Sequence, residues 1–276
     1  MKSELENSTF MNSAQLLPQR RAVDRLLAPI EHTAEASPRL LSKSLGQFES
    51  AGETYVLPRY VYLGPKGGGD TIRIGIFATI HGDEPEGALG VFRLLSLLEK
   101  NPDVAQGYAL FLYPVCNPTG FEDNTRHSRN GKDLNREFWQ SSPEPEVKFL
   151  ETEIWTHAFH GIIALHSDDT SEGVYGFVNG SVLSENLLEP ALRAAEAFLP
   201  RNKQAHIDGF PARQGIISEG YHGVLTAVPQ LKPPPFEVTL ETPQKMPLHL
   251  QVEAFAAALQ TILVEYRYLI AIAQNI

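Results

Sequence analysis

IGIFATIHGDEPEG, residues 74–87, is the stretch that decides the fold. Its first half, residues 74–80, is almost entirely apolar, which is the composition of a buried strand. Asp83 and Glu86 follow at the spacing of a capping box, with Pro85 in the first helical turn. The stretch therefore predicts a buried strand that leads through a short turn into a helix, with Asp83 as the N-cap.

A histidine and an acid stand where this strand meets this helix. His81 ends the strand, and Glu84 opens the helix. Open α/β sheets bind ligands in the crevice beyond the carboxyl ends of their strands, so we expect both side chains to reach that crevice. An imidazole and a carboxylate held there are two of the three protein ligands that a catalytic zinc ion needs.

Composition limits the classes of protein and partner. The chain has 276 residues, 42% of them hydrophobic, and a net charge of -10, which argues against a nucleic-acid or anionic-membrane partner. Cys116 is the one cysteine, so an internal disulfide is excluded. The N-terminus lacks the apolar core of a signal peptide, and the long apolar stretch near the C-terminus carries Glu253, Glu265 and Arg267, unlike a membrane span. We expect a cytoplasmic protein.

The rest of the chain alternates between strand and helix patterns, which predicts an α/β sheet with helices on both faces. Strands are predicted at residues 41–50, 53–64, 74–80, 108–115, 161–165, 173–180 and 236–241. Helices are predicted at residues 19–36, 86–99, 145–159, 184–198 and 248–273. Pro58 marks the second strand as an edge strand. We assign residues 1–41 to an N-terminal extension with one helix, and residues 42–276 to a single domain.

Three of the predicted strands end in residues that can bind a metal, namely His81, His166 and Glu241. Each also has a plainer interpretation. A histidine at a strand end is more often a hydrogen-bonded polar residue. Glu84 could simply interact favourably with the positive end of the helix dipole. Residues 124–138, NTRHSRNGKDLNREF, could be a solvated polar loop. The pattern becomes specific when these segments are taken together and in order.

The order HGDE, NPTG, NTRHSRNGKDLNREF, ALHSDD and VTLETP resembles the zinc carboxypeptidase family, to which the aspartoacylase and succinylglutamate desuccinylase deacylases are related. The resemblance covers about residues 70–270. Around NTR and DLNR the chain is most similar to small bacterial members such as murein peptide amidases. The resemblance implies a mixed, twisted sheet flanked by helices on both faces.

By this resemblance, His81, Glu84 and His166 bind one Zn²⁺ ion and leave a position open for water. Zinc lowers the pKa of bound water to about 7 and polarises the scissile carbonyl. Glu241 matches the family's catalytic glutamate, which takes a proton from this water and passes it to the leaving nitrogen. Glu237 is its competitor, because residues an even number apart on a strand point to the same face.

The same resemblance assigns a polar cluster to Arg126, Asn135 and Arg136. Arg136 and Asn135 would hold a substrate carboxylate, since a guanidinium grips a carboxylate through two parallel hydrogen bonds. Arg126 would stabilise the oxyanion, with Arg129 as the alternative because the loop length is ambiguous. Tyr221, in EGYHGV, corresponds to the tyrosine that closes over the substrate, or is a packed loop residue.

Other polar residues receive lesser roles. Asp168 or Asp169 either orients a metal ligand through a hydrogen bond or belongs to a solvated turn. Asp133 is assigned a structural role. His157 and His160 are also structural, because no acid or third histidine is placed to complete a metal site with them.

The sequence thus predicts a zinc-dependent hydrolase of an amide bond next to a carboxylate, first a metallocarboxypeptidase or peptide amidase that acts on a small peptide. The alternative is an N-acyl amino acid deacylase. About 35 residues with a helical pattern follow Glu241, whereas deacylases of this group often carry an extra β domain there. A non-catalytic binding protein on the same fold is a third hypothesis, weakened because the ligands, the glutamate and the arginine cluster are all present.

Overall fold

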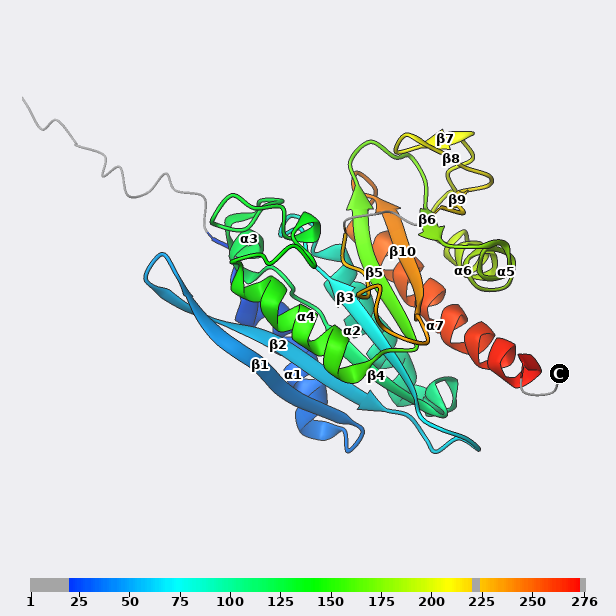
Figure 1. Cartoon of the computed structure of the whole chain (residues 1–276), viewed down its shortest axis with the longest axis horizontal. Helices are drawn as coiled ribbons and strands as arrows, with labels where there is room; N and C mark the ends of the chain where they lie inside the picture. Colours follow the sequence, from blue (N-terminus) through cyan, green and yellow to red (C-terminus); the bar gives the residue numbers. More distant parts are fainter. Residues whose placement is uncertain (1–19, 220–223, 274–276) are drawn as a thin grey trace, which may run out of the picture.

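The computed structural model describes residues 20–219 and 224–273, and its centre is a twisted sheet (Figure 1). Within these residues, eight strands pair in the order β1-β2-β4-β3-β5-β10-β6-β9. Their bounds are Leu40–Ser50 (β1), Glu53–Leu63 (β2), Ile72–Ala78 (β3), Tyr108–Tyr113 (β4), Gly161–Asp168 (β5), Tyr175–Val178 (β6), Ile216–Ile217 (β9) and Phe236–Pro243 (β10). A short hairpin pairs β7 (His206–Ile207) with β8 (Phe210–Pro211).

The sheet is mixed, as predicted. Strands β4, β3, β5 and β10 run parallel at its centre. The β1–β2 hairpin joins β4 in antiparallel fashion, and β6 joins β10 in antiparallel fashion. The carboxyl ends of the central strands therefore lie at one edge, which brings the residues after β3 close to the last residues of β5 and β10.

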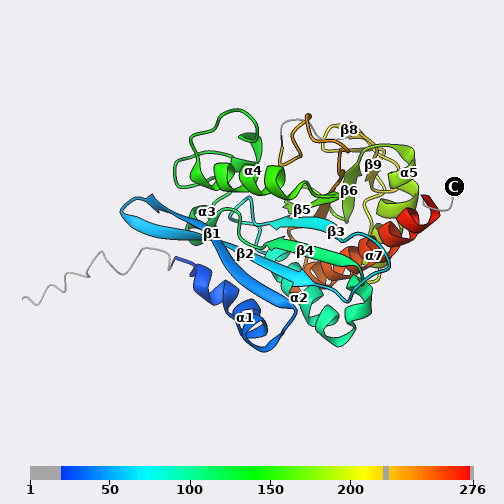
Figure 2. The same cartoon turned by 60° about the horizontal axis from the view of Figure 1, so that its bottom comes forward.

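Helices cover both faces of the sheet (Figure 2), which confirms the predicted fold class. One face carries α1 (Val23–Ala36), α2 (Glu86–Lys100), α6 (Glu189–Ala195) and α7 (Leu248–Ala273), and the other carries α4 (Pro145–His157). Short helical segments are η2 (Pro102–Ala105), α3 (Pro118–Asp123), η3 (Leu134–Arg136), α5 (Ser181–Leu183) and η4 (Ser184–Leu188).

Each face has its own apolar core, and α4 illustrates how the sequence builds one. Val147, Leu150 and Ile154 recur at helical spacing and are fully buried against the sheet. Complete burial of such a side chain stabilises the fold by about 1.5–3 kcal/mol. Strand β5 is buried from Gly161 to Ser167, because helices or loops cover both of its faces.

Helix α7 is 26 residues long and, by length and composition alone, apolar enough to cross a membrane. Its first half is a core helix, however, with Phe255, Leu259 and Ile262 buried against α2 and α6. Its second half is more exposed, and Tyr268 lies on the surface. The apolar character of this part of the helix is therefore explained by its packing against α2 and α6.

The expected N-terminal extension is described from residue 20 onward. Its helix is α1, four residues shorter at the start than predicted. Leu27 and Ile30 of α1 belong to the main core beside α2.

The prediction that Pro58 marks an edge strand is wrong. Strand β2 lies between β1 and β4. Pro58 is tolerated because β4 pairs with β2 only from Tyr60 to Leu63, so no ladder bond to β4 is lost at position 58. On its other side, Pro58 faces Ser44 at a register shift in β1.

The capping box at the start of α2 is also wrong. The helix begins at Glu86, its N-cap is Pro85, and no side chain caps it through a hydrogen bond. Asp83 lies in the turn before the helix and lines the cavity described below. The conformation of this turn depends on contacts with another segment of the chain, described below, and the local sequence does not reveal these contacts.

Candidate active site

The candidate metal ligands lie at the carboxyl ends of β3 and β5, with His81 and Glu84 after β3 and His166 within β5, two residues before its end. Strand β3 ends at Ala78, three residues before His81, and the chain then turns at Thr79, whose φ is 53°. The backbone N–H of Cys116 donates to Ala78 O (3.1 Å), and that of Asn117 donates to Thr79 O (3.0 Å). These two hydrogen bonds therefore fix the turn that carries His81 to the turn that follows β4.

The NPTG segment strengthens this support. Asn117 caps α3, because its Oδ1 accepts from Gly120 N (2.8 Å), and its Nδ2 donates to Ile80 O (3.2 Å). Gly82 packs so closely on Gly120 that a Cβ at position 82 would lie 1.9 Å from the Gly120 carbonyl carbon. Only glycine fits there. Asn117 was not among the predicted site residues, although an asparagine just before a helix-starting proline is a recognisable N-cap.

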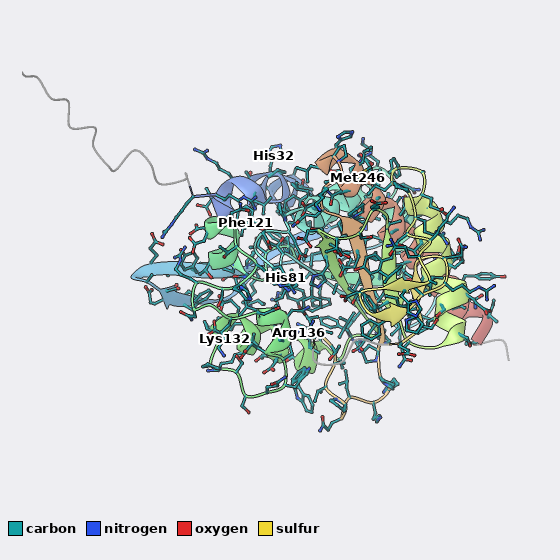
Figure 3. The ribbon with its side chains drawn as sticks, turned by 90° about the horizontal axis from the view of Figure 1, so that it is seen from above. His32, His81, Phe121, Lys132, Arg136 and Met246 are labelled. Atoms are coloured by element: carbon teal, nitrogen blue, oxygen red, sulfur yellow. The ribbon has the colours of Figure 1, made fainter. Side chains whose placement is uncertain are left out.

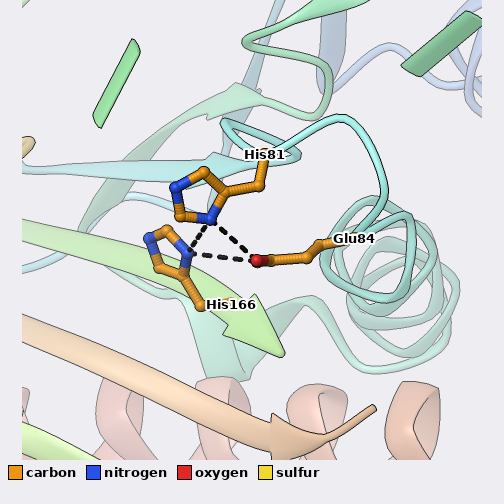
Figure 4. Close-up of side chains that lie close together, drawn as sticks. All are labelled: His81, Glu84 and His166. Atoms are coloured by element: carbon orange, nitrogen blue, oxygen red, sulfur yellow. Dashed lines mark hydrogen bonds and ion pairs between the residues drawn. The ribbon is translucent and has the colours of Figure 1, made fainter. Parts of the chain in front are cut away.

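The side chains of His81, Glu84 and His166 are buried and converge on one point (Figure 4). His81 Nδ1 lies 2.7 Å from Glu84 Oε1, and His166 Nδ1 lies 3.1 Å from Glu84 Oε2. The two Nδ1 atoms are 3.2 Å apart. A tetrahedral ion with bonds of about 2.0–2.1 Å holds its ligands about 3.3 Å apart, so these atoms are spaced to hold one. Two imidazoles and a carboxylate suit Zn²⁺ and related divalent ions.

The pKa shifts of Glu84 and His166 suit a cation. Burial opposes ionisation of Glu84, but the neighbouring His166 and His81 hold its pKa below the ordinary value. Burial also lowers the pKa of His166, which favours the neutral imidazole. Metal binding requires an ionised carboxylate and an unprotonated imidazole nitrogen, and Glu84 and His166 favour these forms. At His81, burial is outweighed by the hydrogen bonds to Asp133 and Glu84, which raise the pKa, so an ion bound there would displace a proton.

Asp133, predicted to be structural, contacts the candidate ligand His81. Its Oδ1 lies 3.2 Å from His81 Nε2, and its Oδ2 accepts from Arg126 Nε (3.3 Å) and Nη2 (3.2 Å). Such a carboxylate fixes the orientation of a ligand histidine and increases its basicity. Despite burial, the hydrogen bond and charge of His81 hold the pKa of Asp133 well below its usual range. The DLNR motif thus supports the metal site as well as the polar cluster.

Asp168, which the sequence offered for that supporting role, has other partners. Its Oδ1 accepts from Thr170 Oγ1 (2.7 Å), and its Oδ2 accepts from Tyr175 Oη (2.9 Å). Asp168 and Asp208 line the cavity on the side of Glu241. Asp208, which no sequence motif marks, lies on the turn between β7 and β8.

Strand register separates the two glutamates of β10. Glu241 pairs with His166 in the parallel ladder to β5, whereas Glu237 pairs with Ile162. Four residues of strand span about 13 Å, so only Glu241 lies beside the ligands. Glu237 Oε1 instead accepts from Ala227 N (2.6 Å). Burial, followed by the charges of nearby carboxylates, raises the pKa of Glu241 well above its ordinary value, as is common for catalytic acids and bases.

A cavity of about 360 Å³ opens over the three ligands and contains the predicted polar cluster. Arg126, Asn135 and Arg136 line it with His81; Figure 3 labels His81 and Arg136. Arg126 Nη1 lies 3.7 Å from Glu84 Oε1.

Arg129, the alternative to Arg126, is committed elsewhere. Its Nε lies 2.8 Å from Asp123 Oδ2, and its Nη1 lies 3.0 Å from Glu53 Oε2. These ion pairs tie the end of α3 to the β1–β2 hairpin. Of the two arginines, Arg126 is the one that lines the cavity.

Asn135 Oδ1 accepts from Leu225 N (2.9 Å), so this amide also holds the chain that lines the cavity from residue 224 onward. Tyr221, the expected substrate-covering tyrosine, lies outside the described residues. Arg136 is exposed, with its side chain at the cavity.

Comparison with known families explains why these motifs occur together. Residues 70–207, half of the chain, match the model of the succinylglutamate desuccinylase/aspartoacylase catalytic domain. The chain belongs to this family. The match includes all three candidate metal ligands and the DLNR motif, and it ends before β10. The predicted relation to the desuccinylase group is confirmed, whereas the likeness to murein peptide amidases stays a prediction. No curated protein sequence matches the chain.

Solved structures confirm the carboxypeptidase-like fold. A protein from Shewanella amazonensis, assigned to the metallopeptidases, superposes with a TM-score of 0.74 and 23% identity over 87% of this chain and 91% of its own. A metallo-carboxypeptidase from Burkholderia cenocepacia gives 0.69 and 17%, over 91% and 70%. A metallo-carboxypeptidase from Pseudomonas aeruginosa, in complex with (2-guanidinoethylmercapto)succinic acid, gives 0.66 and 18%, over 89% and 69%. The family match indicates a hydrolase, and the cluster of His81, Glu84 and His166 is arranged to hold a metal ion.

Proposed function

We propose that this protein is a zinc-dependent metallocarboxypeptidase or peptide amidase, which hydrolyses an amide bond next to a free carboxylate in a small peptide. One observation carries the proposal. Glu241 is in register with the ligand His166, in a cavity that also contains Arg126 and Arg136. A general base, an oxyanion-stabilising cation and a second cation for a carboxylate are the groups that this hydrolysis needs.

His81, Glu84 and His166 would hold the ion. A zinc ion held there would acidify a water molecule and polarise the carbonyl of the scissile bond. Glu241 would take the proton of the attacking water, and would then deliver it to the leaving nitrogen. The raised pKa of Glu241 suits protonation of the leaving nitrogen, because a carboxyl group with a raised pKa remains protonated at a higher pH and can then act as the acid.

The arginines divide the remaining work. Arg126 lies 3.7 Å from Glu84 and would stabilise the negative charge that develops on the carbonyl oxygen when water attacks the carbonyl carbon. Arg136 would grip the substrate carboxylate, and Asn135 would help to position it at the cavity wall. Arg136 and Asn135 together form the proposed carboxylate clamp. This clamp would hold the substrate so that the scissile amide, and no other, lies over the metal ligands.

Deacylation of an N-acyl amino acid is the second candidate, and the family match favours it. The same residues would perform the same chemistry, with the carboxylate clamp holding the amino-acid half. The two reactions differ in what lies on the acyl side of the amide, a peptide in one case and a small acyl group in the other.

Turnover on a mixed panel tests both candidates. The zinc-loaded protein is incubated with short peptides, murein-type peptides with γ-D-glutamyl bonds and N-acyl amino acids, and the products are identified by mass spectrometry. Glu241→Gln is the control, since it removes the base and keeps the size of the side chain. Release of a C-terminal residue by the wild type alone supports the peptidase, and release of an acyl group supports the deacylase. A zinc-replete protein with no turnover on any class contradicts the proposal.

A further inference from the structure

A second cavity adjoins the first along the face of the sheet. Its volume is about 370 Å³, and it shares lining residues with the first cavity, among them Ala164, Phe177 and Thr239. These three residues lie on adjacent strands, because Thr239 pairs with Ala164 on one side and with Phe177 on the other. They form the common wall between the two cavities.

Along β10, alternate residues on one face lead from the first cavity into the second. Glu241 pairs with the ligand His166 at the near end, Thr239 follows, and Glu237 pairs with Ile162 at the far end. The distance along the strand from Glu241 to Glu237 is about 13 Å. Glu237 lines the second cavity and Glu241 the first, so the sheet face connects the candidate base with a second carboxylate.

The second cavity is mostly apolar. Phe138, Trp139, Ile162, Phe177 and Val178 contribute to its walls. Among its lining residues within the described part of the chain, Glu237 is the one with an ionisable side chain. A mostly apolar cavity with one carboxylate in its wall matches a ligand with an aliphatic stem and a terminal cation.

Glu237 is fixed in place, which a selective site requires. Its Oε1 accepts from Ala227 N (2.6 Å), and the indole N–H of Trp139 donates to Thr226 O (2.8 Å) in the same segment. Leu225 N donates to Asn135 Oδ1, so the segment that covers the second cavity is also bonded to the proposed carboxylate clamp. This bond therefore fixes the position of the second cavity relative to the carboxylate clamp.

We propose that Glu237 determines substrate specificity: the residue whose carboxylate is clamped by Arg136 extends its side chain into the second cavity, where Glu237 selects a terminal ammonium or guanidinium group. A side chain of the lysine type, with an ammonium on a stem of about four carbons, has the required chemistry. This inference rests on the proposed function. It holds equally for a peptidase and a deacylase, because both reactions place an amino-acid half in the clamp.

The test compares two substrates that differ only in charge. One carries lysine in the clamped position, and the other carries norleucine, which has a similar stem without the ammonium. A charge-assisted contact in a partly desolvated pocket predicts that the wild type favours lysine about 10- to 100-fold in kcat/KM. In Glu237→Gln the amide oxygen can still accept from Ala227 N, but the charge is gone, and the ratio should fall close to one. Glu172→Gln, an exposed residue outside both cavities, should keep the wild-type ratio.

Calorimetry separates failure of this inference from failure of the proposed function. Free lysine and free norleucine are titrated into the zinc-loaded Glu241→Gln protein and into the Glu237→Gln/Glu241→Gln double variant. Tighter binding of lysine that is lost in the double variant supports the role of Glu237, whatever the outcome of the turnover panel. Equal binding of the two amino acids, or a lysine preference that survives Glu237→Gln, overturns it. In that case the carboxylate of Glu237 serves only to anchor the backbone at Ala227.

Discussion

Replacement of Asp133 by Asn should weaken zinc binding without unfolding the site. Asp133 bonds to His81 Nε2 through one oxygen and to Arg126 through the other. Asn keeps an acceptor for His81, and it keeps the cap on Asn135 N that starts η3. It removes the negative charge that favours the orientation and basicity of His81.

The expected magnitude follows from these contacts. Loss of the hydrogen-bonding partner of a ligand histidine typically costs 10–100-fold in metal affinity, or about 1.4–2.7 kcal/mol. The ion pair with Arg126 adds little to stability, because the arginine side chain is 44% exposed and the pair is screened by solvent. The zinc dissociation constant should therefore rise by one to two orders of magnitude, while the melting temperature of the metal-free protein changes little.

Competition with a chromophoric chelator at neutral pH measures the dissociation constant. Asp123→Asn is the matched control, since Asp123 is also a partly exposed aspartate paired with an arginine, Arg129, but lies outside the cavity. A zinc affinity within twofold of the wild type in Asp133→Asn would refute this account of His81. Equal weakening in both variants would attribute the effect to general loss of charge.

Three further results are expected. His166→Ala should lose stoichiometric zinc in elemental analysis, and one zinc per chain in the variant would show that the ligand set is wrong. Arg126→Ala should lower kcat about 100- to 1,000-fold with little change in melting temperature, whereas Arg129→Ala, which breaks three ion pairs, should mainly lower the melting temperature; the opposite pattern would exchange the two roles. Burial raises the pKa of Glu146 from 4.5 to about 7, so the neutral form is favoured in the folded state and stability is lost as pH rises through that value. Relative to Glu146→Gln, the wild type should lose about 2–3 kcal/mol between pH 5 and pH 8 in urea unfolding, and parallel stability curves would contradict the buried-acid account.

Local pattern predicted most elements, because their periodicity records which faces are buried. The runs that became β3, β5 and β10 and the helices α2, α4 and α7 were placed close to their observed bounds. The turn from His81 to Glu86 was less predictable. Its conformation depends on Asn117 and Gly120 of another loop, which leave no trace in the composition of the turn itself.

Within the site, the sequence could nominate residues but could not always rank them. Alternation allowed either Glu237 or Glu241 as the base, and only pairing with β5 separates their positions. Arg126 and Arg129 were equally difficult, since their roles depend on Asp133 and Asp123. Asp133 itself was missed because its partner His81 lies 52 residues earlier, at a distance that no motif spacing encodes.

The distance along the chain between the two histidines has a further consequence, for the lifetime of the folded state. His81 and His166 are 85 residues apart, and they meet only after β3 and β5 have paired. Contacts of such long sequence separation form late, because the intervening loop must first be closed. An ion that binds only the completed cluster stabilises the native state without stabilising the folding transition state. Zinc should therefore slow unfolding without changing the refolding rate. A chelator should accelerate unfolding while the refolding rate stays the same.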